Sequence, residues 1–369
     1  MPAEFDSYEG DFAILVIVSN LYARMKKGLL SIVQYFFFAA LAAFFVWLSI
    51  RDLDKRSWAQ LKDAMDRANY WLLVPVLLLL LASHLLRALR WKQLIEPLGY
   101  KPSLLNTFFG VIIGYFVNLG APRLGEVVKC TILSRYEKVP VDKLVGTIVA
   151  ERAFDVICLA IVFLLTLVFQ FDVIHALVWD DLMAVFRNAG GKITWGKMAI
   201  AAAFVLLIFV GVRFVLSRYG HINVVQKIRG VFVNIWYGLI SVRALKNKQL
   251  FFVYSAGIWT LYLLSTWVGF FAIKETSGLS LADALSVLAM GSIGMIVSPG
   301  GIGAYALFVE KTVAFYNVPD LPYGRALGWL LWFGQFLSFI LFGVASFILL
   351  PRVNRKRVIA YEPTADHPA

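Results

Sequence analysis

Long apolar runs dominate the pattern of hydrophobic and polar positions along this chain. At a rise of about 1.5 Å per residue, helices formed by these runs are long enough to cross a hydrocarbon layer of roughly 30 Å. The run at 71–86 is the shortest, but Trp71 and Arg87 can sit at the two membrane interfaces. The pattern predicts an all-α polytopic membrane protein with six full transmembrane helices, at 29–50, 71–86, 144–169, 198–216, 251–273 and 326–350.

Two further apolar segments are interrupted by glycine and proline. Residues 104–119 lead into a break at 120–125, and residues 281–297 lead into a break at 299–303. A half-length helical pattern follows each break, at 126–136 and at 304–317. We expect these segments to form two re-entrant helical hairpins. The alternative is that glycine and proline only permit kinks or close helix packing.

The two breaks resemble each other in spacing. Gly114 precedes Pro122 by eight residues, and Gly291 precedes Pro299 by eight. With the first hairpin entering from the cytosolic side and the second from the outer side, the hairpins are oppositely oriented, as in an inverted repeat. Irregular backbone survives within a bilayer only where protein buries it or a wet cavity borders it. The breaks therefore indicate a substrate site near the membrane midplane.

Basic residues in the loops predict the orientation. Residues 87–101 carry four lysines and arginines against Glu96, and residues 213–248 carry seven with no acid. The positive-inside rule then places these loops and both termini in the cytosol, with the chain in the inner (cytoplasmic) membrane. Residues 222–239 have helical apolar spacing, which indicates either an amphipathic helix on the membrane surface or a helix packed against the spans.

Composition supports lipid as the solvent of this chain. Apolar residues make up 60% and charged residues 16% of the 369 positions, which excludes an ordinary soluble domain. The net charge of +12 comes from basic residues in loops beside apolar spans. Contact with anionic lipid headgroups explains these residues better than binding to nucleic acid does. Cys130 and Cys158 lack metal-type spacing and predict free thiols. We expect no metal, no cofactor and no nucleic-acid partner.

The chain divides into three parts by pattern. Residues 1–24 carry four acids among their first eleven positions. This pattern predicts an N-terminal extension outside the fold, which could be disordered. Residues 25–357 form one transmembrane domain, and residues 358–369 form a cytosolic tail. Whether residues 1–24 belong to the native protein is left open.

Charged residues inside apolar stretches are the best candidates for chemistry, because each costs about 2.5–3.5 kcal/mol at a bilayer centre. They must therefore pair with each other, face water or hold a charged ligand. Spacings of three and four place them on common helix faces. They form two sets, Arg123, Glu126 and Lys129 after the first break, and Glu151, Arg152 and Asp155 in the following apolar segment.

Two hypotheses explain these charges. Arg123 and Arg152 are suited to a phosphodiester through the bidentate guanidinium fork, and helix starts after the breaks add free amides. The alternative is an internal salt-bridge network that fixes the hairpin. The substrate-binding candidates, with no catalytic or metal residues among them, are Arg123, Glu126, Glu151, Arg152, Asp155, Asn118, Gly125, Gly300, Gly301 and Gly303.

Four pieces of the chain form a recognisable set: Arg87-Ala88-Leu89-Arg90-Trp91, residues 118–126, Glu151-Arg152-Ala153-Phe154-Asp155 and residues 298–303. In this order they resemble the motifs of the lysylphosphatidylglycerol synthase transmembrane-region family, a flippase-like membrane domain. The resemblance covers residues 25–357 and implies lipid translocation without the cytosolic synthase domain that some members carry. An acid often follows the second glycine run in that family, whereas here the first acid is Glu310.

The resulting expectation is a lipid translocase, not an enzyme, that binds an anionic phospholipid or polyprenyl-phosphate lipid between the hairpins. No phosphate-binding loop for ATP is present, so transport would be passive or ion-coupled, with Glu126, Glu151, Asp155 or Glu310 as proton carriers. A lipid-modifying transferase and a non-transporting scaffold are the alternatives. Asp52 and Asp54 resemble a metal pair but read as solvated loop residues. The lipid, the coupling and the oligomeric state stay open.

Overall fold

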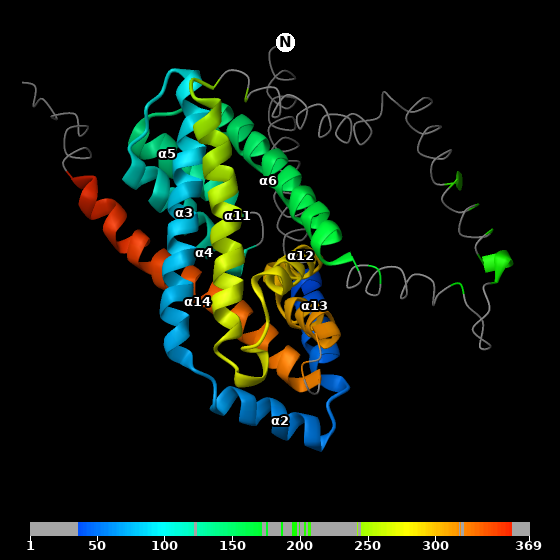
Figure 1. Cartoon of the computed structure of the whole chain (residues 1–369). Helices are drawn as coiled ribbons and strands as arrows, with labels where there is room; N and C mark the ends of the chain where they lie inside the picture. The colour runs from blue at the N-terminus through cyan, green and yellow to red at the C-terminus, as the bar shows by residue number, and fades with distance from the viewer. Residues whose placement is uncertain are drawn as a thin grey trace, which may run out of the picture.

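The computed structural model describes residues 36–121, 124–171, 245–316 and 321–355, with a few short pieces between 171 and 245 and at 318. Throughout these described parts the chain is helical and contains no strand (Figure 1). After a first helix, Phe36–Arg51, the elements in chain order are α2 Lys55–Asp66, η1 Tyr70–Leu72, α3 Leu73–Ile95, η2 Glu96–Leu98, α4 Leu104–Gly120, α5 Leu124–Glu137, α6 Val141–Phe169, α11 Lys248–Phe270, η5 Lys274–Thr276, α12 Leu281–Val297, η6 Pro299–Gly301, α13 Ala304–Val313, η7 Ala314–Tyr316 and α14 Leu321–Val353.

Among the described residues, four helices are long and apolar enough to cross a membrane. They are Tyr70–Leu98, Val141–Phe169, Lys248–Phe270 and Pro322–Val353. The first helix and α2 form a fifth candidate as a bent pair, with 105° between them. The expected span at 198–216 and the amphipathic segment at 222–239 lie almost wholly outside the described residues. The polytopic helical class is therefore confirmed, at four or five described spans.

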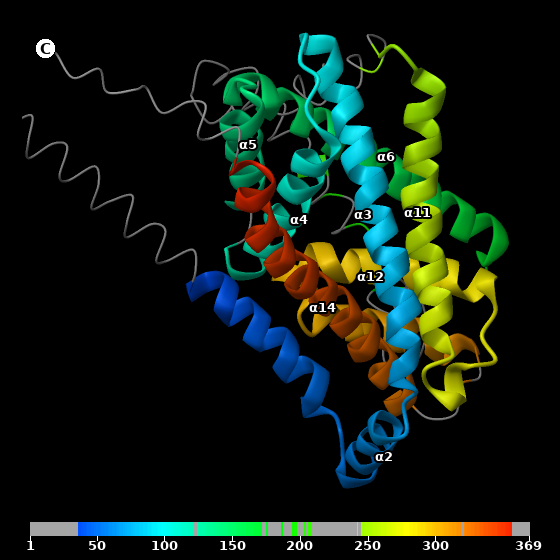
Figure 2. The same ribbon diagram turned by 90° about the vertical axis from the view of Figure 1, so that its left-hand side faces the viewer.

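The long helices run in opposite directions in pairs. Helix α3 packs along α11, and the two views show α3 rising from the end that carries α2 while α11 returns to it (Figures 1 and 2). Helix α6 descends from the far end, and α14 rises toward it. In each half of the described chain, a long helix is thus followed by two shorter helices and a second long helix.

The shorter helices form two hairpins, in which α4 packs on α5 and α12 packs on α13. Helices α4 and α12 both have 17 residues, and a serine side chain, Ser103 or Ser280, accepts a hydrogen bond from the first turn of each. Leu281 follows Leu104 by 177 positions, and Gly291 follows Gly114 by the same interval. The predicted hairpin arms at 104–119 and 281–297 therefore agree closely with α4 and α12.

The segment 51–69, expected to be a loop, contains helix α2. The side chain of Asp54 accepts a hydrogen bond from the Ser57 amide at 2.7 Å and begins this helix. The turn before it stays polar, and Asp52 contacts the exposed Arg51 at 3.1 Å. Asp52 and Asp54 therefore act as a solvated residue and a helix cap, in line with the sequence interpretation.

The buried apolar residues divide into two main clusters. One surrounds Trp91 and joins α3, α4, α5 and α6, with Leu350 added from α14. The other surrounds Tyr305 and Leu327 and joins α12, α13 and α14 with Ala64 of α2. Each hairpin is thereby fixed in its own apolar cluster, and a space lined by residues of both halves lies between them.

Candidate functional site

A cluster of buried charges lies where α3, α5 and α6 meet. Glu151 on α6 is completely buried and contacts Lys129 at 2.7 Å and Arg87 at 3.1 Å. Arg90 lies 3.8 Å from the same carboxylate and is also completely buried. A charge buried without a partner costs several kcal/mol, and three cations around Glu151 offset that cost.

Asp155 lies one turn further along α6 and binds the same two arginines. Its carboxylate accepts hydrogen bonds from Arg87 at 2.6 Å and from Arg90 at 2.5 Å. The side chain of Asp155 keeps 15% of its surface exposed, whereas that of Glu151 keeps none. Asp155 is therefore the acid at the border between the buried network and open space.

Arg152 occupies the more open side of the cluster. Its Nε donates to Glu126 of α5 at 2.9 Å, and its Nη1 lies 3.7 Å from Asp155. The Arg152 and Glu126 side chains are 41% and 36% exposed. Four cations face three carboxylates in the described cluster, which leaves one positive charge in excess; its members are Arg87, Arg90, Lys129, Arg152, Glu126, Glu151 and Asp155.

The cluster forms the polar end of a central cavity of about 380 Å³. Arg87, Arg152 and Asp155 line this end, together with Tyr115 of α4 and Tyr262 of α11. The remaining wall is mostly apolar and comes from α3, α6, α11, α12, α13 and α14. A space with one charged end and one apolar end suits an amphipathic ligand.

Several polar atoms around this cavity have no partner among the described residues. The Nε of Arg87 is buried without a hydrogen-bond acceptor, although its other nitrogens contact acids. Both ring nitrogens of His84, one turn earlier on α3, are likewise buried and unpartnered. Unpaired buried polar atoms are costly, so these side chains add unsatisfied polarity to the buried region beside the cavity.

The structure places the candidates of the first break at different points. Glu126, Glu151, Arg152 and Asp155 come together in the cluster, while Arg123 lies outside the described residues. Asn118 accepts a hydrogen bond from the Gly125 amide at 2.8 Å, across the turn between α4 and α5. Gly125 packs on the backbone of Gly114. These two candidates close the hairpin and are absent from the lining of the central cavity.

The glycines of the second break also shape a turn. Gly300, Gly301 and Gly303 all have positive φ angles, a conformation that other residues adopt at a cost. The Gly300 carbonyl accepts a hydrogen bond from Trp332 Nε1 at 2.8 Å, and Gly303 packs on the backbone of Phe45. None of the three is part of the described cavity lining. The second hairpin instead reaches the cavity through residues of its arms, such as Met295 and Tyr305.

The sequence did not predict that Arg87 and Arg90 belong to the charge cluster. It assigned both to a cytosolic loop after the span at 71–86, but α3 continues to Ile95 and buries them. Their spacing of three places them on one face of that helix, which is the signal that identifies them. The interpretation failed because the acids that hold these arginines lie more than 60 residues away.

A second buried ion pair joins the other hairpin to α14. Glu310 of α13 binds Arg325 of α14 through two hydrogen bonds, and Arg325 donates a third to the Ser49 carbonyl at 2.7 Å. Lys129 and Glu151 join α5 to α6 in the same way, with the charges exchanged. Glu310, expected as a proton carrier, is thus held by an arginine.

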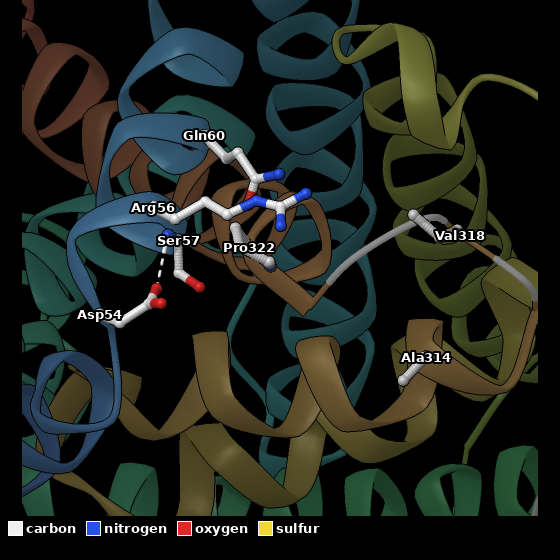
Figure 3. Close-up of a pocket in the computed structure, with 7 residues that line it drawn as sticks. All are labelled: Asp54, Arg56, Ser57, Gln60, Ala314, Val318 and Pro322. Carbon is white, nitrogen blue, oxygen red and sulfur yellow. Dashed lines mark hydrogen bonds between the residues drawn. The ribbon is translucent and has the colours of Figure 1, made fainter.

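A further hollow of about 470 Å³ lies between α2 and the region where α13 leads into α14 (Figure 3). It is lined by Asp54, Arg56, Ser57 and Gln60 of α2 and its cap, and by residues between α13 and α14. The Ser57 amide lowers the pKa of the Asp54 carboxyl, and this group is fully exposed. The hollow contains no buried charge, so the smaller central cavity is the better candidate site.

Taken together, the apolar spans and the buried charge cluster define the class: a multi-pass membrane protein with a polar site among its helices. Residues 31–319 match the family model of the lysylphosphatidylglycerol synthase TM region. The chain belongs to this family, as its motifs indicated.

Two curated UPF0104 membrane proteins are similar to the chain. That of Methanocaldococcus jannaschii is 30% identical over 133 residues, which cover 35% of this chain and 36% of the relative. That of Methanothermobacter thermautotrophicus is 23% identical over 270 residues, which cover 66% of this chain and 75% of the relative. The chain thus spans about a third of the first relative and three quarters of the second. No solved structure matches it.

Proposed function

We propose that this protein is a lipid translocase, and that the central cavity binds the anionic headgroup of its lipid. The excess positive charge at the polar end of the cavity carries this proposal. A phosphate there would accept hydrogen bonds from the partly exposed Arg152 and would lie beside Arg87, which also lines the cavity. Guanidinium groups bind phosphate oxygens with strong, charge-assisted hydrogen bonds.

The proposal includes a membrane arrangement. Residues 25–357 form one domain, in which six spans surround α4–α5 and α12–α13 as re-entrant hairpins. A helix of 17 residues is about 25 Å long, short of the roughly 30 Å that a hydrocarbon core requires. The equal lengths of α4 and α12 and the opposite directions of the long helices in the two halves (Figure 1) support an inverted repeat. In this arrangement both termini lie in the cytosol.

The protein differs in this proposal from a lipid-modifying enzyme. Its described polar residues bind and orient a headgroup, and transport is passive or coupled to ions. The lipid class is an anionic phospholipid or polyprenyl-phosphate lipid. Such a protein needs only a site that both membrane faces reach in turn, which an inverted repeat provides.

The test is transport of fluorescent phosphatidylglycerol in proteoliposomes, followed by quenching of the label on the outer leaflet. We expect the Arg152→Gln variant to lose about tenfold or more in rate, because a tenfold change corresponds to one charge-assisted hydrogen bond of about 1.4 kcal/mol. Arg152→Lys should recover part of the rate, since it restores charge but not the planar fork.

Arg67→Gln is the matched control, because Arg67, the C-cap of α2, is also an exposed, ion-paired arginine but does not line the cavity. Its rate should equal that of the native protein. Chemical conversion of the lipid headgroup in the same vesicles would show that the protein is an enzyme. Neither transport nor conversion in vesicles that contain the native protein would indicate a scaffold. Equal rates for Arg152→Gln and Arg67→Gln would remove the cavity from the mechanism.

A further inference from the structure

A second apolar hollow lies beside the central cavity, between α3, α4 and α14. It has a volume of about 530 Å³, and its wall is almost entirely aliphatic and aromatic. We call it the α3–α4–α14 groove; its lining includes Leu81, Ala82, Leu85, Phe108, Phe342 and Ala345. Ser346 adds a hydroxyl to this wall, but no charged side chain that could bind a headgroup is among the described lining residues.

The groove and the central cavity share the same three helices. On α3, Leu80 and His84 line the cavity, whereas Leu81 and Leu85 line the groove. On α14, Phe339 lines the cavity and Phe342, nearly one turn later, lines the groove. The two spaces are therefore neighbours along one seam, with a short barrier between them.

Three stacked rings, one from each helix, line the cavity and border the groove on α3, where His84 adjoins Leu85. The ring of Tyr115 on α4 lies 5.2 Å from that of His84 and 5.1 Å from that of Phe339, measured between centroids. The His84 and Phe339 rings lie 5.5 Å apart. No hydrogen bond involves the His84 ring in the described part of the chain. Rotation of Phe339 or His84 would therefore open the barrier without breaking a polar contact of these two residues.

We propose that the α3–α4–α14 groove holds the acyl chains of the transported lipid and that the His84–Tyr115–Phe339 stack is the gate between chains and headgroup. This inference rests on the proposed function. A cavity of about 380 Å³ has the size of a small-molecule site, which suits a headgroup but leaves the chains outside. The groove supplies an apolar path for them from the polar end of the site to the bilayer.

The first test fills the groove. In Ala82→Trp the indole occupies the space of the chains, so transport of a diacyl fluorescent phosphatidylglycerol should fall about tenfold, as expected where a ligand loses its pocket. Thermal stabilisation by glycerol 3-phosphate, a headgroup without chains, should stay unchanged. Ala160→Trp on the exposed face of α6 is the matched control and should alter neither measurement.

A second groove position keeps the test valid if the Ala82→Trp variant misfolds. Ala345 lies on the opposite wall and is exposed toward the membrane side, so Ala345→Trp should be tolerated and should slow transport in the same way. If Ala82→Trp and Ala345→Trp both transport at the rate of Ala160→Trp, the groove holds no chains and the inference is wrong.

The third test changes the size of the gate. Transport should decrease in the order Phe339→Leu, native protein, Phe339→Trp. Phe333→Trp on the exposed face of the same helix is the control. Equal rates across the Phe339 series would exclude a gate. Loss of transport in Arg152→Gln with no effect in the groove and gate variants would overturn this inference alone, whereas an unaffected Arg152→Gln would overturn the proposed function.

Discussion

At the residue scale, the cluster contains both completely buried charges and partly exposed charges. Glu151 is completely buried among three cations, so its carboxylate is satisfied only by them. Glu126 and Arg152 pair in a partly exposed place, where solvent screens the interaction. The buried members fit the structural network that the sequence raised as one hypothesis, and the exposed members are the ones that our proposal assigns to a ligand.

We therefore expect Glu151→Gln to lower the free energy of unfolding by roughly 3–5 kcal/mol, because it leaves buried cations without their counter-charge. Glu126→Gln should cost about 0–1 kcal/mol, as exposed ion pairs do. Thermal or denaturant unfolding of both variants in detergent measures the difference. Equal losses would show that the carboxylates do not differ in role.

His84 provides a second test at this scale. It is 2% exposed, and neither ring nitrogen has a described partner. We expect His84→Phe to keep the ring stack and to leave the melting temperature unchanged or higher, because two unsatisfied polar atoms are removed from a buried site. A clear fall in the melting temperature would reveal a hydrogen bond that holds the ring.

At the element scale, close glycine contacts decide how the first hairpin folds. A methyl group on Gly125 would stand 1.8 Å from the Gly114 carbonyl oxygen, so α4 and α5 could not approach as they do. Asn118 accepts the Gly125 amide and closes the same turn. Glycine at these two positions therefore lets the backbones of α4 and α5 touch, as small residues do between helices in membrane proteins.

Gly125→Ala should accordingly destabilise the protein by about 1–3 kcal/mol, the usual cost of overpacking a closely packed site. Gly146→Ala is the control, because Gly146 lies within α6 with nothing near its would-be side chain. That change should be neutral or stabilise by up to about 1 kcal/mol, since alanine favours helix. Melting curves in detergent compare the two, and similar effects would refute the close contact.

At the scale of the whole molecule, the opposite directions of the two halves define a topology. Helix α3 and helix α5 end at the same end of the molecule, while α2 lies at the other (Figure 1). The loops after α3 and α5 should therefore face the same side of the membrane. The proposed inner location of both termini requires that side to be the cytosol.

Cysteine labelling tests this arrangement. In a background without Cys130 and Cys158, Lys101→Cys and Lys138→Cys should react with a membrane-impermeant maleimide from one side only. Lys62→Cys on α2 should react from the other side. Labelling of the first two positions from opposite sides would exclude a re-entrant first hairpin.

Features encoded within a few neighbouring residues were predicted from the sequence alone. Apolar length specified the long helices, and the glycine–proline breaks specified α4 and α12 almost to the residue. Helix α2 was not predicted, because its charged residues of both signs and its aspartate cap are also typical of a polar loop. Spacing along α6 also brought Glu151, Arg152 and Asp155 into consideration, because charge inside an apolar segment is costly wherever it lies.

Only the tertiary structure decided which partners these charges have. Arg87 and Arg90 meet their acids across more than 60 residues, and Arg325 meets the Ser49 carbonyl across 276. The central cavity and the groove are likewise bounded by helices from both halves of the chain. Caps, breaks and helix lengths are local properties of the chain, whereas ion pairs and cavities depend on how separate helices pack against each other.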